Sequence, residues 1–553
     1  MSRRGRTVSG WPADLAVIGR DVGSLLAMES ALMVLSIAVA AGFGEWYAAL
    51  AFLTAAGFTA FIGFGARKAF REAPAPRMKH GMIIAAAGWF ATAAFGALPF
   101  VLTAYFIPEA ALAALVPRGV EYTQSSLLYF RNPLHAFFES MSGWTGSGLT
   151  MAIHEPSLPR SIQWWRSLIQ WVGGVGVIVL TVSILSRPGS GSYALYRGEA
   201  REEKIHPSVV STVRTVWKIF VGYTALSILV LFVAISLSDY GRTIPTWEAA
   251  WQALNHAMTA LSTGGFSVTD NSIATYDSPL IETVLLPIMA LGAIAFPIHY
   301  AILQNRELNK LWRDLQTRWL LVIFAVGVVG LSVQNLVALP TTPSTAFAAT
   351  ANYFDLSMVV GGAGSDAIRD STFQWISALS CTGFQSAPIG QWSDGGKLVL
   401  SSAMVLGGAA GSTVGGIKII RAYTISRGIR WQFSRVFLPS NAIVSLKIDG
   451  RRLSRPEMER EFSEASIVSL LWLFVLLGSS LLLVNLVGAE FTFADALFEV
   501  ASAQGNVGLS TGITGPTMNP LAEGMFLLNM WVGRLEIIPV LVFFRSVLYG
   551  LNP

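Results

Sequence analysis

The sequence predicts an all-α polytopic membrane protein: four pseudo-symmetric helix–pore-loop–helix units around a central pore, plus an N-terminal helical hairpin. Three observations predict this fold class. Of the 553 residues, 53% are apolar and 13% are charged, whereas soluble domains usually carry about 25% charged residues. Apolar stretches of about 20 residues, long enough to cross a bilayer core, recur along the chain. Four shorter segments lie between pairs of these stretches, and each ends in a glycine-bearing loop.

The first two apolar stretches, at residues 15–41 and 45–66, should form the hairpin. The first stretch is too long for the apolar part of a cleavable signal peptide, so we expect it to remain as a membrane helix. No glycine loop follows this pair, which places it outside the repeat. The chain therefore divides into the hairpin at 1–70 and pore units at 71–190, 191–305, 306–425 and 426–553.

Each unit should contain an outer helix, a short helix and an inner helix. The expected ranges are 80–106, 132–143 and 162–186 in unit 1; 212–237, 248–261 and 279–304 in unit 2; 316–338, 367–380 and 396–424 in unit 3; and 464–487, 493–504 and 521–549 in unit 4. A single amphipathic segment as short as these is typical of a helix lying on the membrane surface. Four in the same relative position, each before a glycine loop, favour re-entrant pore helices instead.

The glycine loops have the composition that a cation filter needs. One glycine lies at an equivalent point of each loop: Gly148, Gly265, Gly383 and Gly508. Backbone carbonyls can replace the water shell of a potassium ion without a fixed charge. Successive carbonyls face one axis only where the backbone visits positive φ, which glycine adopts at little cost. A lone glycine would more simply indicate a turn or a close helix contact, but the fourfold recurrence favours a filter.

The third inner segment contains a cluster of small residues. They are Gly407, Gly408, Gly411, Ser412, Thr413, Gly415 and Gly416. Each glycine costs about 1 kcal/mol relative to alanine in a helix interior, so we expect this segment to break into a loop at membrane depth. Small-residue helix packing is the alternative. The cluster is not a nucleotide-binding P-loop, because Ile417 stands where the lysine would have to be.

Arg534 lies in the fourth inner segment, which is otherwise apolar. A charge there is costly and usually marks an ion path or a paired site. We expect Arg534 to face the pore below the filter, to repel cations and to donate hydrogen bonds to carbonyls of the 407–416 loop. An ion pair with Glu536 is the alternative, and Lys418 is a weaker gate candidate.

The distribution of charge predicts the topology. Basic residues gather in alternate connections, such as 67–79, 187–218 and 421–460. These connections, and with them both termini, should be cytoplasmic by the positive-inside rule. Topology and contact with anionic lipids explain the basic loops, and nucleic-acid binding is disfavoured because no polar domain could present them.

Other candidate residues have simpler expected roles. Cys381 is the only cysteine, which excludes an intrachain disulfide. His135 and His256 fall in short helices and should have core or interface roles. Acidic residues near outer helix ends could concentrate cations at the pore mouth, although each alone is more often a solvated loop or cap residue. They are Asp270, Asp277, Asp366, Asp370, Asp394 and Asp495.

The stretches 136–143, 170–176, 407–418 and 533–539, with the glycine loops, resemble the TrkH/KtrB superfamily of potassium uptake permeases, closest to TrkH. The resemblance implies potassium uptake across a bacterial cytoplasmic (inner) membrane and a pore blocked by the 407–416 loop. It also implies a homodimer that works with a cytoplasmic nucleotide-binding ring of the TrkA type, so that this chain itself binds no nucleotide.

The same resemblance implies that potassium is coordinated by backbone oxygens of the filter glycines and the residues before them. These are Gly146, Ser147 and Gly148; Thr263, Gly264 and Gly265; Cys381, Thr382 and Gly383; and Asn506, Val507 and Gly508. Glycine at all four equivalent positions favours potassium over sodium in this family.

Two other classes of protein compete with a potassium permease. A secondary transporter would have discontinuous helices around a substrate site at the membrane midplane, in two inverted repeats. A membrane-embedded enzyme would need a nucleophile–base or metal constellation within the spans, and the sequence has none at catalytic spacing. The sequence leaves open whether flux is channel-like or coupled to protons or sodium.

Overall fold

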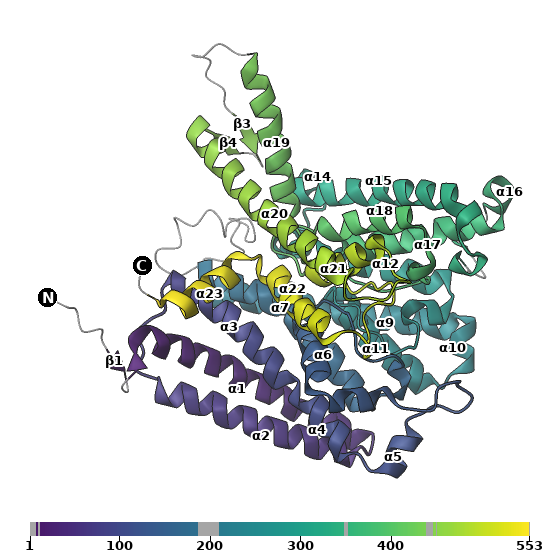
Figure 1. The fold of residues 1–553 in the computed structure, drawn as a ribbon, viewed down its shortest axis with the longest axis horizontal. Helices are drawn as coiled ribbons and strands as arrows, with labels where there is room; N and C mark the ends of the chain where they lie inside the picture. Colours follow the sequence, from purple (N-terminus) through teal and green to yellow (C-terminus); the bar gives the residue numbers. More distant parts are fainter. Residues whose placement is uncertain are drawn as a thin grey trace.

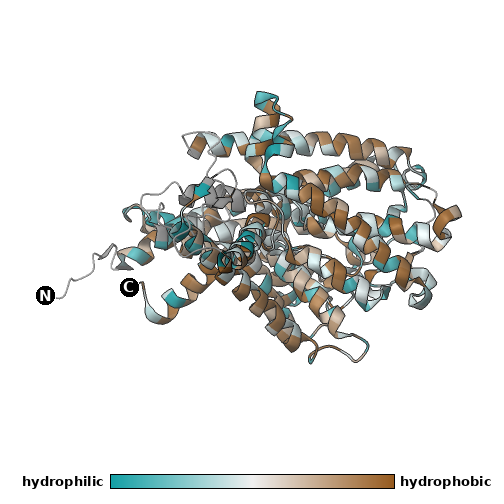
Figure 2. Ribbon diagram, turned by 90° about the horizontal axis from the view of Figure 1, so that it is seen from above, coloured by the Kyte–Doolittle hydropathy of each residue, from teal (hydrophilic) through white to brown (hydrophobic). Residues whose placement is uncertain are grey.

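The computed structural model describes residues 7–8, 11–185, 209–347, 352–354, 356–437, 446–448 and 451–551. Within them, six helices are long and apolar enough to cross a membrane, or up to eight if each of two bent helix pairs is one span. The long helices run roughly side by side (Figure 1). Hydrophobic residues dominate the helices on the right of Figure 2, and hydrophilic residues gather on the left. The all-α, multi-pass fold class is therefore confirmed.

The N-terminal hairpin follows a short strand pair. Its elements are β1 (Thr7–Val8), β2 (Trp11–Pro12), α1 (Ala13–Gly42) and α2 (Trp46–Ala69). The two helices touch where glycines remove the side chains between them. A Cβ on Gly63 would stand 2.7 Å from the Ala27 nitrogen and 2.9 Å from the Gly23 carbonyl oxygen.

The next segments repeat the order of outer, short and inner helix. Unit 1 has α3 (Met78–Gly96), α4 (Leu98–Phe106), α5 (Glu109–Ala114), η1 (Ser126–Arg131), α6 (Pro133–Thr145), η2 (Glu155–Ser157) and α7 (Arg160–Leu185). Unit 2 has α9 (Val209–Leu237), α10 (Asp239–Thr243), α11 (Thr246–Leu261), η4 (Ser272–Tyr276), α12 (Pro279–Ala293) and α13 (Phe296–Asn305). The short helices are α6 and α11.

The second half of the chain has the same order. Unit 3 has α14 (Lys310–Arg313), α15 (Leu315–Ala338), η5 (Leu339–Thr341), η6 (Ser344–Phe347), α16 (Ser357–Val360), α17 (Gly362–Leu379), η7 (Ile389–Gln391), α18 (Asp394–Val405) and α19 (Ile419–Val436). Unit 4 has β3 (Leu446–Ile448), β4 (Arg451–Leu453), α20 (Arg455–Leu483), α21 (Phe493–Gly505), α22 (Pro520–Leu535) and α23 (Ile538–Tyr549). Helices α19 and α20 pack together and, with the β3–β4 hairpin, project beyond the bundle (Figure 1).

Two inner helices that the sequence predicted as continuous are broken. The prediction of one helix over 279–304 is wrong, because α12 and α13 meet at 106°, and that over 521–549 is wrong, because α22 and α23 meet at 116°. Pro297 and Pro539 lie in the first turns of α13 and α23, where the missing N–H is tolerated but the preceding helix cannot continue. In unit 4 the break also contains Ile537 at φ +51°, a strained value for a β-branched residue.

The close glycine contact between α1 and α2 predicts that substitution of Gly63 lowers the thermal stability more than the same substitution of Gly65. Gly63→Leu should force these helices apart, because overfilling a packed contact typically costs about 1–3 kcal/mol. We expect a lower midpoint of thermal unfolding in detergent. Gly65→Leu is the matched control, since a Cβ on Gly65 meets nothing within 4 Å. Equal midpoints for the two variants would contradict this packing.

Candidate ion pathway

The four short helices end in the same way. The first or second residue after each helix takes a left-handed conformation: Gly146 (φ 71°), Thr263 (55°), Cys381 (50°) and Asn506 (54°). The next backbone N–H then donates to the carbonyl five residues back, at 2.9 Å in every case: Ser147 to Ser142, Gly264 to Thr259, Thr382 to Ser377, and Val507 to Ser502. This is a Schellman-type ending. It turns the backbone out of each short helix in the same direction.

The four glycines that the sequence predicts to line a filter bring their loops, called the filter loops after that prediction, into contact. Gly148, Gly265, Gly383 and Gly508 have φ of 80°, 74°, 76° and 103°. A Cβ on each would overlap a carbonyl oxygen of the following unit, and unit 1 follows unit 4. The pairs are Gly148 with Gly264, Gly265 with Thr382, Gly383 with Val507, and Gly508 with Ser147. The structure therefore brings the predicted filter residues together in a closed cyclic order.

A buried polar residue of each short helix supports the strand that leaves the filter. These residues are Glu139, His256, Gln374 and Glu499, and each stands at the same distance before its filter glycine. Glu139 accepts the Met151 N–H at 2.8 Å, and Glu499 accepts the Thr511 N–H at 2.8 Å. His256 accepts the Val268 N–H at 3.2 Å, so that ring nitrogen carries no proton. The core role predicted for His256 is consistent with these contacts, but the four supports were not predicted from the sequence.

Charged or polar pairs join each inner helix to the short helix of the following unit. They are Arg160–Glu248 (2.7 Å), Glu282–Arg369 (2.6 Å), Lys397–Asp495 (2.6 Å) and Glu523–His135 (2.9 Å). These pairs close a second ring around the bundle. Asp495, which sequence analysis considered for cation attraction, is 4% exposed and bonded to Lys397. The sequence did not predict these pairs, because the two partners of each pair lie far apart in the chain.

The small-residue cluster of unit 3 is non-helical. The chain leaves α18 at Val405 and re-enters a helix, α19, at Ile419. Thr413 Oγ1 donates to the Gly292 carbonyl at 2.9 Å and lies 2.9 Å from Thr263 Oγ1. The 407–416 loop thus lies against the second filter loop and the end of α12.

Arg534 contacts this loop from the fourth inner helix. Its Nη1 donates to the Thr413 carbonyl at 2.5 Å, and its Nη2 donates to the Gly173 and Gly174 carbonyls of α7 at 3.1 and 3.3 Å. Glu536 pairs instead with Arg421. Arg534 thus connects unit 4 to the loop of unit 3 and to the inner helix of unit 1, at the depth of the helix breaks. Lys418, the weaker candidate, donates to the Val414 carbonyl within the loop.

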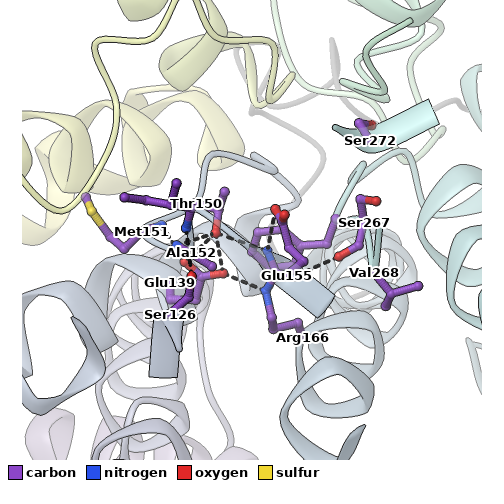
Figure 3. A network of polar contacts seen from close by, with 12 residues as sticks. Ser126, Glu139, Thr150, Met151, Ala152, Glu155, Arg166, Ser267, Val268 and Ser272 are labelled. Atoms are coloured by element: carbon purple, nitrogen blue, oxygen red, sulfur yellow. Dashed lines mark hydrogen bonds and ion pairs between the residues drawn. The ribbon is translucent and has the colours of Figure 1, made fainter. Parts of the chain in front are cut away.

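Arg166 lies among the strands that leave the first two filter loops (Figure 3). It is 1% exposed. Its Nε donates to Glu139 at 2.7 Å, Nη2 to Thr150 Oγ1 at 3.0 Å, and Nη1 to the Ser267 carbonyl of unit 2 at 2.8 Å. Arg166 was not predicted as a site residue, because an arginine near a helix start is also common at a solvated end.

Glu155 lies beside this cluster, in η2 on the outer connection, with one carboxylate oxygen 3.9 Å from Arg166. Its other oxygen has no hydrogen-bond partner among the described residues. Burial raises the pKa of this carboxyl to about 8, although the charge of Arg166 acts in the opposite direction. Glu155 is therefore neutral at the pH where an exposed carboxyl is ionised.

The chain is similar to known cation transporters over most of its length. The family model described as TrkH, cation transport protein, matches residues 52–549. An uncharacterised cation transporter of Methanocaldococcus jannaschii is 30% identical over 90% of this chain and 89% of that protein. The Trk system potassium uptake protein TrkH of Halomonas elongata is 29% identical over 97% of this chain and 99% of that protein.

The fold is also that of a solved transporter. The crystal structure of the potassium transporter TrkH from Vibrio parahaemolyticus superposes with a TM-score of 0.74 at 23% identity. The superposition covers 97% of this chain and 99% of that chain. The arrangement of helices is therefore shared across almost the whole of both chains.

The raised pKa of Glu155 predicts a pH-dependent stability. An unfolded glutamate has a pKa near 4.5 and the folded one about 8. Between these values the folded state holds a proton that the unfolded state lacks, so the free energy of unfolding falls as pH rises. Glu155→Gln should flatten the fall in thermal midpoint from about pH 5 to about pH 8. The exposed Glu109→Gln should keep the wild-type slope; the same slope in all three proteins would refute the assignment.

Proposed function

This chain belongs to the TrkH family of cation transport proteins, and from that premise we propose that it takes up potassium through a selectivity filter formed by its four glycine loops. Membership of a transport family makes it a transporter rather than an enzyme. The observation that carries the proposal is the cyclic contact of the four glycines, each against the carbonyl of the next loop. A closed ring of backbone carbonyls can replace the water shell of a cation on one axis.

The proposed ligands are the backbone oxygens of the residues at 146–148, 263–265, 381–383 and 506–508. Two left-handed residues separated by one other occur in all four segments, which supports an equivalent backbone path in each. The segments differ in one respect. The Gly264 carbonyl accepts a hydrogen bond from Gln170 at 2.7 Å, which leaves one of its two lone pairs for an ion.

The proposed gate is the 407–416 loop together with Arg534. The guanidinium holds the loop by its Thr413 carbonyl, close to the second filter loop. A fixed positive charge at this depth also opposes the passage of cations until it moves. Release of this contact would let the loop leave the path.

The proposed setting is the bacterial cytoplasmic membrane, with both termini in the cytoplasm. The chain would form a homodimer in the lipid and bind a cytoplasmic TrkA-like nucleotide-binding ring. The projecting α19–α20 pair, with exposed Arg435, Arg455 and Arg460, supports a docking role there. The basic connection 187–218 lies largely outside the described residues.

The broken helices favour one alternative, a gradient-coupled secondary transporter. A flux measurement in reconstituted vesicles distinguishes a gated channel from a coupled transporter. The vesicles have equal potassium on both sides and an imposed proton or sodium gradient. A gated channel gives no net potassium accumulation at zero membrane potential. Accumulation against the resulting potassium gradient would support coupling, and absence of any potassium flux down its own gradient would refute the proposed function.

Gly383→Ser tests the third loop as part of the filter. The new Cβ would overlap the Val507 carbonyl oxygen at φ 76°. Backbone strain of this kind costs about 1–3 kcal/mol, and about 1.4 kcal/mol is a tenfold change in an equilibrium. We expect the potassium/sodium ratio of uptake to fall about tenfold. Gly512→Ser is the control, because φ is 102° but a Cβ meets nothing within 4 Å. An unchanged ratio in Gly383→Ser removes this loop from the filter.

Arg534→Ala tests the gate. Loss of the buried charged hydrogen bond, which typically contributes about 1.5–3 kcal/mol, should shift the closed state toward the open one roughly tenfold or more. We expect a higher basal rubidium flux in vesicles. Arg421→Ala is the control, since Arg421 is also buried at this end of the inner helices but pairs with Glu536. Unchanged flux in Arg534→Ala, or an equal rise in Arg421→Ala, contradicts the gating role.

A further inference from the structure

The inner helix of unit 1 differs from the other three on the face that meets the next filter loop. The four inner helices align on a glycine at the same distance from each helix start: Gly173, Gly292, Gly407 and Gly533. In this alignment, the position of Gln170 is methionine in the other units, at Met289, Met404 and Met530. The position of Arg166 is apolar in the others, at Leu285, Leu400 and Phe526.

Gln170 forms two hydrogen bonds with the backbone of the second filter loop. Its Nε2 donates to the Gly264 carbonyl at 2.7 Å, and its Oε1 accepts the Phe266 N–H at 3.0 Å. Gln170 is fully buried. A primary amide offers one acceptor and one donor group side by side, so it pairs with the loop on both sides of the filter glycine Gly265.

Arg166 lies one helical turn before Gln170 and holds the same loop further along. It donates to the Ser267 carbonyl at 2.8 Å and lies 4.2 Å from the centre of the Phe266 ring. Its pair with Glu139 fixes the guanidinium in place (Figure 3). The backbone of the second loop is thus held by side chains of α7 from Gly264 to Ser267.

A methionine at this position offers no N–H donor and only a weak sulfur acceptor. At the other three contacts between an inner helix and the loop of the next unit, the equivalent residue therefore cannot form this pair of bonds. The contact between units 1 and 2 therefore differs from the other three in its polar side chains. These side chains belong to the inner helix α7, whereas the loop glycines are the same in all four units.

We propose that Gln170 is a specificity-determining positioning residue, which holds the Gly264 carbonyl so that the filter favours the larger potassium ion over sodium. This inference rests on the proposed function of the glycine loops. Two physical effects act together. The bonds resist collapse of the second loop around a smaller ion. The N–H donor also weakens the field of the Gly264 oxygen, and weak-field ligands favour the cation that loses its water shell more easily.

The test replaces Gln170 with the residue of the other three units. Gln170→Met keeps a similar volume and removes both bonds, and Gln170→Asn keeps the amide but shortens its reach. Gln170→Met loses both bonds that hold the second loop, so we expect the potassium/sodium ratio of uptake to fall about tenfold, a change of about 1.4 kcal/mol. The apparent KM for potassium should rise, because Gln170 positions an oxygen that binds the ion. The maximal rate per transporter should stay within about twofold of the wild-type rate.

Gln163→Met is the matched control on the same helix. Gln163 is also buried, but it bonds the Trp251 indole and the Glu155 and Leu158 carbonyls, away from the filter residues. Its ratio should equal that of the wild type. A wild-type ratio in both Gln170 variants, or an equal shift in Gln163→Met, overturns the inference. If the wild type prefers sodium, the proposed function fails, while a shift confined to the Gln170 variants still supports the positioning role.

Discussion

The four loops meet around one axis because the residues at their closest approach carry no Cβ. Gly148, Gly265, Gly383 and Gly508 each lie against a carbonyl oxygen of the next loop, and an added methyl group would overlap that oxygen. This constraint needs positive φ as well as empty space, and glycine supplies both. The short helices, their shared endings and the second ring of charged or polar pairs all serve to bring these four points to the same place.

The pathway is symmetric in its backbone and asymmetric in its inner helices. Arg166 and Gln170 act on the second loop from one corner, and Arg534 reaches the 407–416 loop from another. The equivalent positions in the other inner helices are apolar or small. A single chain with four unequal units can place each charge once, whereas four identical chains would place it four times. In the proposed function, selection and closure therefore belong to different inner helices of the same chain.

Sequence patterns predicted the spans, the short helices and the four glycines at which the loops meet, because apolar length and local glycine spacing carry that information. They also predicted the contact between Arg534 and the loop, through the cost of a charge in an apolar span. They did not predict the left-handed Thr263 and Cys381, whose residue types usually avoid positive φ. Pairs such as His135 with Glu523 were also missed, because their partners lie far apart in the chain.

The most direct test is an experimental structure in a rubidium or thallium salt, whose ions are identified by anomalous scattering. The account predicts cation density on the axis between Gly148, Gly265, Gly383 and Gly508, within coordination distance of backbone oxygens from all four loops. It also predicts that the Gly264 carbonyl keeps its bond to Gln170. Ions bound away from these glycines, or held by side chains at a site within the helix breaks, would contradict it.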